Sequence, residues 1–396
     1  MAERRVPRIR FKGFEEDWEQ RKLEELVIFN PKATIPEIFE YVDLESVVGT
    51  KMISHRSESK RTAPSRAQRL AQVGDLFYQT VRPYQKNNYL FERSDGYYVF
   101  STGYAQMRPL VSGEFLFSLI QNEEFVKIVL DKCTGTSYPA INVKDLGQIT
   151  VFLPESSREQ RQIGRFSQYL DTLLSLHQRK LEKLKILKKA MLEKMFPKNG
   201  EKVPEIRFSG FTEDWEQRKF SDLYEKSSEK NDGSIGVDRN ITVASMQFKT
   251  DVRVNTVEYL KTYYTFRLGD IAFEGHQSKE FRFGRFVEND IGDGIVSHIF
   301  AVFRPMGHYD LRYWKYAINN ERLMQRVLSH STKASTMMHD LVEKDFLNEL
   351  FLVPSVKEQR SIGEFLFSVD RSISLHQRKL EKLREIKKSM LERMFV

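Results

Sequence analysis

The sequence predicts an α+β protein in which two mixed α/β domains are separated by two long antiparallel coiled-coil helices, arranged as a tandem repeat with pseudo-two-fold symmetry. Three observations predict this. A short motif near the N-terminus recurs 197 residues later, a basic, leucine-rich block recurs near the C-terminus, and the two stretches between these blocks do not align. A period of this length is far above the ~20–50 residues of a solenoid repeat and indicates a duplicated chain.

The short motif opens each half of the chain. Residues 7–26 read PRIRFKGFEEDWEQRKLEEL and residues 204–223 read PEIRFSGFTEDWEQRKFSDL, with 14 of 20 positions identical. The first copy defines an N-terminal segment over 1–26. The second copy lies in a linker segment over 198–223, which follows the helix-stopping sequence Pro-Lys-Asn-Gly that starts at Pro197.

The leucine-rich block predicts the two long helices, over 155–197 and 355–396. The decapeptide SLHQRKLEKL occupies 175–184 and recurs without change at 374–383. Apolar residues recur there at intervals of three and four, which is the pattern of a coiled coil. The predicted seam consists of Leu170, Leu174, His177, Leu181 and Leu184 in the first helix and Val369, Ile373, His376, Leu380 and Leu383 in the second. We interpret the two seam histidines as residues that fix register.

The divergent stretches predict two domains, over 27–154 and 224–354. Gly-Asp, Arg-Pro and Pro landmarks keep their order in both and suggest one shared fold; they are Gly74-Asp75 and Gly269-Asp270, Arg108-Pro109 and Arg304-Pro305, Pro154 and Pro354. Turn-bounded apolar runs predict strands, and amphipathic runs predict one helix per domain. The predicted strands are 74–83, 97–109 and 147–154, then 269–275, 294–305 and 350–354, and the predicted helices are 112–132 and 311–329.

Composition narrows the class of protein. The 396 residues carry 63 Lys and Arg against 55 Asp and Glu, a net charge of +8, which suits a polyanionic partner such as nucleic acid. Cys133 is the single cysteine, so a disulfide scaffold and a cysteine zinc site are excluded. No apolar run reaches the ~18–20 residues that cross a bilayer. We therefore expect a cytoplasmic protein that does not enter a membrane.

Polar loops in equivalent places of the two domains are the candidate DNA contacts. Arginine and glutamine can pair bidentately with guanine and adenine edges, and hydroxyl groups suit phosphate or base-edge hydrogen bonds. The candidates are Arg56, Lys60, Arg61, Arg66, Arg82, Thr134, Thr136, Ser137 and Tyr138 in the first domain and Gln277, Lys279, Arg282, Arg285, Ser331, Thr332 and Lys333 in the second. The alternative interpretation of each stretch is an ordinary polar surface loop.

The sequence offers no self-contained active site. It contains no phosphate-binding P-loop, no Gly-x-Gly-x-x-Gly and no His-Glu-x-x-His motif. The sequence at Asn30 matches the Asn-Pro-Pro-aromatic motif of amino-methyltransferases only in part, because Lys and Ala follow Pro31. We therefore expect no catalytic residues, no metal ligands and no cofactor in this chain.

The duplicated DWEQRK and SLHQRKLEKL blocks around two divergent domains resemble the specificity subunit of type I restriction–modification enzymes. The resemblance covers the whole chain. It implies two target-recognition domains that each read one half of an asymmetric, bipartite site in double-stranded DNA. It also implies two methyltransferase (modification) subunits and restriction/translocase subunits as partners, which would carry S-adenosylmethionine, ATP and Mg. The alternative is a coiled-coil scaffold without DNA-sequence recognition, which leaves the basic loops unexplained.

Overall fold

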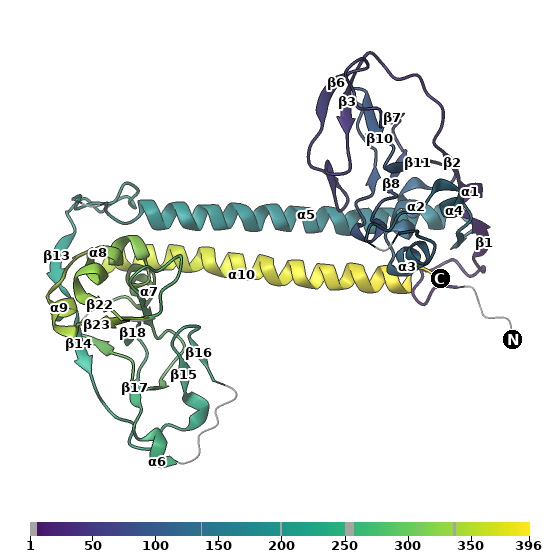
Figure 1. The fold of residues 1–396 in the computed structure, drawn as a ribbon. Helices are drawn as coiled ribbons and strands as arrows, with labels where there is room; N and C mark the ends of the chain where they lie inside the picture. The colour runs from purple at the N-terminus through teal and green to yellow at the C-terminus, as the bar shows by residue number, and fades with distance from the viewer. Residues whose placement is uncertain (1–5, 136, 199, 250–256, 308, 336–337) are drawn as a thin grey trace. The chain divides into compact units, whose positions relative to one another are not determined.

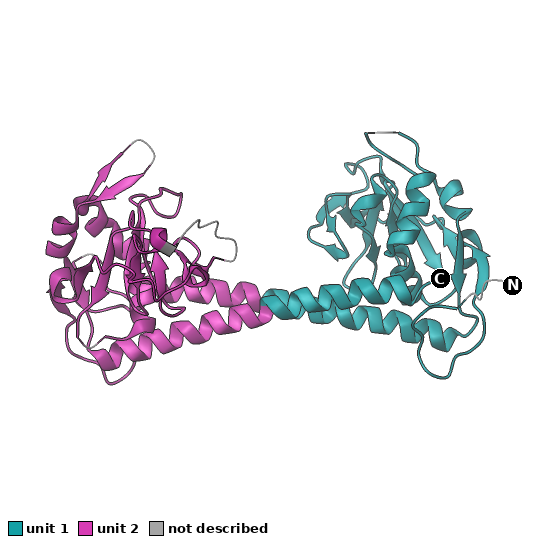
Figure 2. Ribbon diagram, turned by 90° about the horizontal axis from the view of Figure 1, so that it is seen from below, with its two compact units in different colours: residues 1–179, 377–396 teal, residues 180–376 magenta. Residues whose placement is uncertain are grey.

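The computed structural model describes residues 6–135, 137–198, 200–249, 257–307, 309–335 and 338–396 (Figure 1). They form two compact units (Figure 2), unit 1 with residues 1–179 and 377–396, and unit 2 with residues 180–376. The α+β class is confirmed, with long helices α5 (Ser157–Lys194) and α10 (Val356–Arg393). No helix in the described part of the chain is long and apolar enough to span a membrane.

Unit 1 is built on small sheets and short helices, with the start of α5 and the end of α10. The sheets have the orders β1-β12, β2-β11-β8-β9 and β6-β3-β10-β7. The strands are β1 (Glu19–Lys22), β2 (Val27–Phe29), β3 (Ile38–Val42), β6 (Arg56–Ser59), β7 (Ala67–Leu70), β8 (Leu76–Gln79), β9 (Tyr89–Leu90), β10 (Tyr98–Ser101), β11 (Tyr104–Pro109) and β12 (Thr150–Leu153), with a small ribbon of β4 (Val47–Val48) and β5 (Lys51–Met52). The helices are α1 (Leu23–Leu26), α2 (Gly113–Ile120), α3 (Glu123–Asp131), α4 (Val143–Gly147) and the 3-10 turn η1 (Pro83–Gln85).

Unit 2 repeats two of these sheets and carries smaller ribbons in place of the third. Its sheets have the orders β13-β24, β14-β21-β18-β19, β15-β16, β17-β20 and β22-β23. The strands are β13 (Glu216–Lys219), β14 (Tyr224–Ser227), β15 (Ile241–Thr242), β16 (Gln247–Phe248), β17 (Tyr264–Phe266), β18 (Ile271–Glu274), β19 (Arg285–Glu288), β20 (Gly294–Val296), β21 (Val302–Pro305), β22 (Thr332–Ala334), β23 (His339–Leu341) and β24 (Leu350–Val353). The helices are α6 (Val257–Leu260), α7 (Leu311–Ile318), α8 (Glu321–Ser331), α9 (Glu343–Asn348) and the 3-10 turns η2 (Phe220–Asp222) and η3 (Val237–Arg239).

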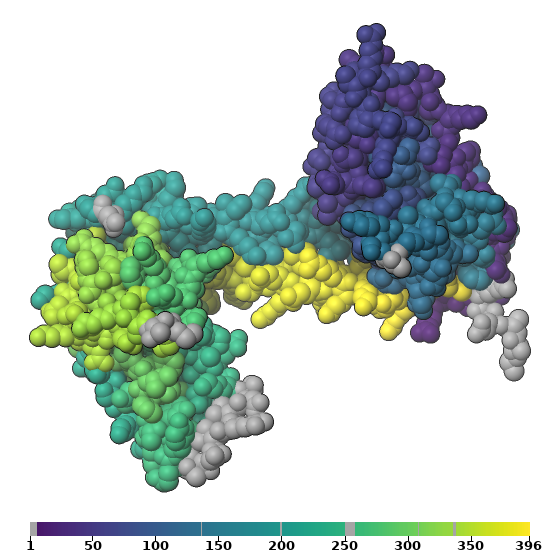
Figure 3. All heavy atoms as spheres, viewed as in Figure 1, coloured from purple at the N-terminus to yellow at the C-terminus, as the bar shows by residue number. Residues whose placement is uncertain are grey.

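The two units share one framework and differ at the end remote from the long helices. The ribbon β1-β12 pairs Glu19 with Leu153, and β13-β24 pairs Glu216 with Val353 in the same register. The sheets β2-β11-β8-β9 and β14-β21-β18-β19 also correspond strand for strand. The sheet β6-β3-β10-β7 of unit 1 projects away from α5, and this projection is visible in the space-filling view (Figures 1 and 3).

Each copy of the short motif ties the start of one long helix to the end of the other. In unit 1 the Arg10 guanidinium forms two hydrogen bonds of 2.7 and 2.9 Å with Glu159 in the first turn of α5, and the Ile9 N–H donates to the Arg393 carbonyl at the end of α10. In unit 2 Arg207 binds Glu358 at 2.7 and 2.8 Å. The Ile206 N–H likewise donates to the carbonyl of Lys194. Identity between the motif copies is thus explained by two repeated clamps.

An aromatic triad closes the core beside each clamp. The Trp18 ring lies edge-on to Phe115 of α2 and to Phe395, which follows α10, at 5.8 and 6.1 Å between ring centroids. The equivalent triad of unit 2 is Trp215, Tyr313 and Phe196, with centroid distances of 6.2 Å to Phe196 and 6.3 Å to Tyr313. The buried tryptophan of each DWEQRK block therefore packs on the phenylalanine that follows a long helix.

The repeated Glu-Gln-Arg-x-Ile-Gly block places a glycine where the long helix crosses a short one. A Cβ on Gly164 would lie 2.6 Å from backbone atoms of α2, and a Cβ on Gly363 would lie 2.7 Å from the Tyr313 nitrogen of α7. Gln160 accepts from the Ser112 N–H and donates to the Pro154 carbonyl. Gln359 makes the same two bonds with Asp310 and Pro354. The carbonyls of the two landmark prolines therefore make equivalent contacts in the two units.

The other two landmarks are the two ends of one ion pair. Asp75 is 1% exposed and accepts from Arg108 at 2.8 and 3.0 Å. Asp270 is equally buried and accepts from Arg304 at 3.1 and 3.0 Å. Burial raises the pKa of Asp270 although Arg304 opposes the shift. A carboxylate buried in this way depends on its arginine, because an unpaired buried charge is strongly destabilising.

The structure corrects the predicted helices 112–132 and 311–329, which are each broken in two by an asparagine. The Asn122 side chain accepts from the Glu124 N–H to cap α3 and donates to the Leu391 carbonyl of α10. Asn320 caps α8 and donates to the Leu192 carbonyl of α5. The predicted strand 97–109 is likewise two strands, β10 and β11. An N-capping side chain fixes a helix start, so these helical segments cannot continue as single helices.

The predicted seam is only partly buried. Leu170 in unit 1 and Leu181, Leu184 and Val369 in unit 2 are 5–8% exposed, and Leu380 in unit 1 is 3% exposed. The remaining seam positions are half-buried, namely Leu174, His177, Ile373, His376 and Leu383. An ion pair flanks the helix contact in each unit, Lys387 with Asp171 in unit 1 and Lys188 with Asp370 in unit 2. The two pairs occupy equivalent positions of the repeat.

Unit 2 buries an acid where unit 1 has a leucine. Ile271 of β18 pairs with Glu288, and the equivalent Leu76 of β8 pairs with Leu90. Glu288 is 3% exposed, and neither carboxyl oxygen has a hydrogen-bond partner among the described residues. Burial, with a smaller contribution from Asp290, raises the pKa of Glu288 well above its usual value of 4.5.

Alanine at Gly164 should destabilise the protein. The intrinsic gain of ~1 kcal/mol for alanine over glycine in a helix is outweighed by a clash with backbone, which typically costs ~1–3 kcal/mol or more. Denaturant unfolding should therefore show a lower midpoint for Gly164→Ala and Gly363→Ala. Gly96→Ala is the control, because a Cβ at that position would have no neighbour within 4 Å. Equal midpoints for all three variants would contradict the close approach.

Removing the Glu288 charge should stabilise unit 2 at neutral pH. The folded pKa lies above the unfolded one, so stability is full below pH 4.5 and falls as the pH rises toward the folded pKa. Glu288→Leu should add ~1–3 kcal/mol at pH 7, and Glu288→Gln should flatten the pH dependence. Chemical unfolding at a series of pH values measures both effects, with the exposed Glu280→Gln as control. A parallel pH profile for wild type and Glu288→Gln would refute the assignment.

Candidate nucleic-acid interface

Two segments of unit 1 that carry predicted site residues are brought together at one edge of its framework sheet, and the first of them, predicted as part of strand 74–83, leaves the strand after Gln79. The loop 80–88 connects β8 to β9, and its Val81 pairs with Ala140 in the loop after α3. The Arg82 N–H donates to the Pro139 carbonyl at 2.7 Å, and the Ile141 N–H donates to the Thr80 carbonyl at 3.0 Å. Arg82 and the hydroxyl-rich loop therefore form one surface.

That surface presents exposed polar groups. Thr134 and Ala140 exchange backbone hydrogen bonds of 2.9 and 3.0 Å, which closes a short hairpin. Gly135 turns this hairpin at φ +88°, a conformation that favours glycine. Thr134, Ser137 and Tyr138 are exposed, and the Arg82 guanidinium carbon lies 4.3 Å from the centroid of the Tyr138 ring. The predicted Thr136 lies outside the described residues.

Unit 2 builds the same surface from different residues. The loop 275–284 connects β18 to β19, and the Gly275 carbonyl accepts from the His339 N–H at 2.8 Å in the β22-β23 ribbon. His276 pairs with Met338, and the rings of Phe283 and His339 lie 5.5 Å apart. The predicted Gln277, Lys279 and Lys333 are exposed on these two segments. Thus both units join the same two loops at the same sheet edge.

The arginines of the unit 2 loop contact phenylalanine rings. Arg282 lies over Phe283 with 5.4 Å from its guanidinium carbon to the ring centroid, and Arg285 lies over Phe281 at 5.0 Å. Arg285 also forms an ion pair with Glu274 at 2.8 Å and donates to the Ala244 carbonyl. The Arg285 donors are therefore largely used within the protein, whereas Arg282 is more open to a ligand.

The first basic segment of unit 1 is divided between paired and open residues. Arg56 on β6 lies 4.7 Å from the Tyr41 ring and pairs with Asp43 and Glu58 at 2.8 and 2.9 Å. Arg61 is 90% exposed, with Glu37 at 3.8 Å. Lys60 and Arg66 are exposed on the same segment. Lys60, Arg61 and Arg66 are suited to a phosphate backbone, and Arg56 already has two carboxylate partners.

Ser331 and Thr332 do not belong to the exposed set. Ser331 is fully buried, and its hydroxyl donates to the Val327 carbonyl at 2.7 Å. The half-buried Thr332 donates in the same way to Leu328 at 2.6 Å. Both hydroxyls satisfy the last turn of α8, a local bond that serine and threonine make readily. The prediction that these hydroxyls reach DNA is therefore wrong for Ser331 and weakened for Thr332.

Arginine–aromatic contacts also form outside the residues that the sequence predicted, at Arg93, Arg239 and Arg312. The Arg239 guanidinium carbon lies 5.0 Å from the centroid of the Phe248 ring in unit 2. The two residues are brought together by the β15-β16 hairpin, which pairs Ile241 with Phe248. The alternation of arginine and phenylalanine that marks residues 281–286 is absent here, so the sequence carries no signal for it.

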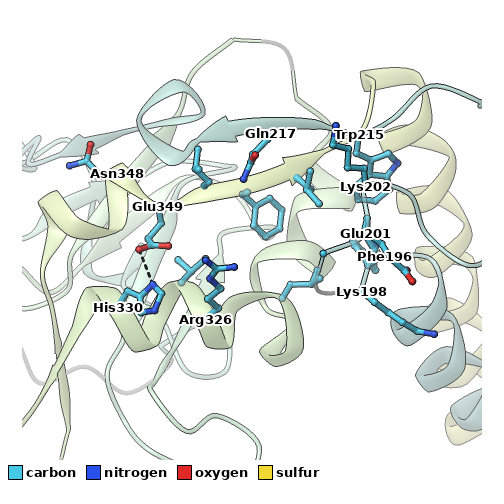
Figure 4. A pocket seen from close by; sticks show the side chains of 17 residues that line it. Phe196, Lys198, Glu201, Lys202, Trp215, Gln217, Arg326, His330, Asn348 and Glu349 are labelled. Atoms are coloured by element: carbon cyan, nitrogen blue, oxygen red, sulfur yellow. Dashed lines mark hydrogen bonds and ion pairs between the residues drawn. The ribbon is translucent and has the colours of Figure 1, made fainter.

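A hollow of about 480 Å³ lies elsewhere in unit 2, between α8, the β13-β24 ribbon and the segment around Lys198 (Figure 4). Three of its basic side chains have acidic partners, and Glu201 and Arg326 also line it. Lys198 binds Glu205, Lys202 binds Asp214, and His330 binds Glu349 across the floor. Such a hollow does not concentrate positive charge, so the loop surfaces remain the candidate interface. Within the described ranges, no group of three or more His, Cys, Asp or Glu residues could hold a metal ion.

Comparison with known proteins places the fold. No protein-family model matches the chain, and no curated protein matches it. The S subunit of a type I restriction–modification system from M. genitalium is 13% identical over 99% of both chains, with a TM-score of 0.61. The HsdS subunit of Thermoanaerobacter tengcongensis is 21% identical over 96% of both chains, with a TM-score of 0.48. A chain from a structure of the type I R-M system is 18% identical over 95% of this chain and 97% of that one, with a TM-score of 0.49. The chain thus has the fold of a type I restriction–modification S subunit.

Proposed function

We propose that this chain is the DNA-recognition and scaffolding subunit of a type I restriction–modification complex in the cytoplasm. Each unit reads one half of an asymmetric, bipartite site in double-stranded DNA. The chain itself carries no catalysis. Two methyltransferase subunits and the restriction/translocase subunits bind to it, and they hold S-adenosylmethionine, ATP and Mg.

One observation carries this proposal. The loops 80–88 and 275–284 leave the same sheet edge, pair with the same second loop, and share no sequence pattern. The framework beneath them repeats down to single contacts, such as Arg10 with Glu159 and Arg207 with Glu358. A constant framework with two different polar loops is suited to reading two different sequences. The net charge of +8 favours DNA as the ligand.

The repeated helix block supports two copies of one partner. Leu176 is 55% exposed and its counterpart Leu375 is 51% exposed, although each belongs to an identical decapeptide. Packing within the chain does not require a leucine at an exposed position. The units have diverged widely elsewhere, so identity at an exposed apolar residue supports a surface that binds the same protein twice. We assign this surface to the methyltransferase subunits.

Duplicating one recognition domain should produce a site with two like halves. In this variant residues 224–354 are replaced by residues 27–154. The wild-type chain and the variant are each used to select sequences from random DNA duplexes. Wild type should select two unlike half-sites separated by an unspecified spacer, and the variant should select the first half-site twice. Selection of no sequence by the correctly folded wild-type chain would favour a scaffold that does not recognise DNA.

Replacing one of the two repeated leucines by aspartate should prevent the binding of one methyltransferase subunit. An interface anchor of this kind contributes ~2 kcal/mol or more. Native mass spectrometry should therefore count one methyltransferase subunit on Leu176→Asp or Leu375→Asp and none on the double variant. Ile186→Asp is the matched control, because Ile186 is 68% exposed on the same helix but its counterpart is Glu385. Two bound subunits on the double variant would place the methyltransferase interface elsewhere.

A further inference from the structure

Arg82 is held in a backbone conformation that arginine rarely adopts. Its φ is +54°, in the left-handed region, and Pro83 follows it. A side chain with a Cβ is strained there, and a following proline narrows the choice of conformations further. Residues strained in this way persist where their surroundings over-determine them, and they gather at functional sites. Hydrogen bonds around Arg82 hold its backbone in this conformation, and its side chain is placed where it can bind a ligand.

The loop around Arg82 is fixed from both sides. On one side its N–H donates to the Pro139 carbonyl at 2.7 Å. On the other, Gln79 donates from its Nε2 to the Val81 carbonyl at 2.6 Å and to Gln85 at 2.9 Å. Lys86, which also has φ +54°, donates from its Nζ to the Gln121 carbonyl. The loop is thus preorganised before any ligand binds.

The Arg82 side chain combines an exposed ring with unused donors. Its guanidinium carbon lies 4.3 Å from the centroid of Tyr138, which is 63% exposed. The guanidinium has no ion pair or hydrogen bond with any residue in the described ranges. Arg56 makes a similar ring contact with Tyr41, but two carboxylates occupy its donors. Arg82 is therefore free to give its planar donors to a ligand, and Arg56 is not.

We infer that Arg82, held over the Tyr138 ring, is a specificity-determining residue of unit 1 that recognises a guanine in the major groove. Guanine offers the O6 and N7 acceptor pair that matches the arginine fork. The ring restricts the guanidinium through a cation–π contact, so less side-chain freedom is lost on binding. A phosphate contact would need charge but not this orientation. The inference rests on the proposed DNA recognition and adds the residue and the base.

Sequence selection with Arg82 variants tests this. The full-length chain is incubated with random DNA duplexes, and bound sequences are counted at each position. Arg82→Gly keeps the left-handed backbone and removes the fork, and Arg82→Lys keeps the charge. In Arg82→Gly the preference for one guanine in one half-site should fall about tenfold or more, while the other positions keep theirs. Arg82→Lys should lose less of this preference, because lysine can also donate to guanine. Tyr138→Leu should weaken the preference for the same guanine, and Tyr138→Phe should preserve that preference.

The controls separate this inference from the proposed function. Arg56→Ala should leave every base preference unchanged, because its donors are already paired. Thermal unfolding of Arg82→Gly should not occur at a lower temperature, since glycine relieves the strained φ. If wild type selects a motif that Arg82→Gly and Arg82→Lys leave intact, or weaken equally at all positions, Arg82 does not read a base. If wild type selects no motif, the DNA-recognition proposal fails together with this inference.

Discussion

The structure depends on the repeated clamp through which an isoleucine–arginine pair joins the start of one long helix to the end of the other. Glu159 and Glu358 are 1% exposed at their side chains, and each has a bidentate arginine partner. Loss of one partner of such a buried pair costs ~3–5 kcal/mol, because the remaining charge is left unpaired. The backbone bonds of Ile9 and Ile206 satisfy helix-end carbonyls that would otherwise lack partners. Each unit is thus closed by residues from distant parts of the chain.

Much of this fold could be predicted because the duplicated blocks are packing contacts. Identity at Trp18 and Trp215, or at Gly164 and Gly363, reflects a ring or a close approach that tolerates little change. The breaks at Asn122 and Asn320 were not predicted, because an asparagine within an amphipathic pattern gives the same periodicity whether it caps a helix or lies on its surface. The hydrogen bonds of these asparagines to the long helices hold them at the helix starts, and these bonds are tertiary contacts.

The candidate site could be predicted only in outline. The sequence named both Arg82, at the end of a predicted strand, and Tyr138, in a polar loop, but the pairing of Val81 with Ala140 that brings them together is a tertiary feature. The sequence could not show that, among the described residues, Arg56 is paired and Arg82 is not, because the carboxylates that pair with Arg56 come from β6 and from the loop at Asp43. It also counted Ser331 as a surface hydroxyl, since the exact end of α8 is not encoded by a strong stop signal.

The contacts that hold the framework together are separate from the loops of the candidate interface. The clamps, the aromatic triads and the Asp–Arg pairs lie in the framework, and none of them includes a residue of loops 80–88 or 275–284. Arg82 in loop 80–88 has a left-handed φ, and in loop 275–284 a Cβ on Gly275 or Gly284 would clash with backbone atoms. Gln79 of the framework strand β8 holds loop 80–88 through two side-chain hydrogen bonds, and the loop at Pro139 supplies a further backbone contact. Under the proposed function, the unlike loops of the two units give a duplicated framework two different specificities.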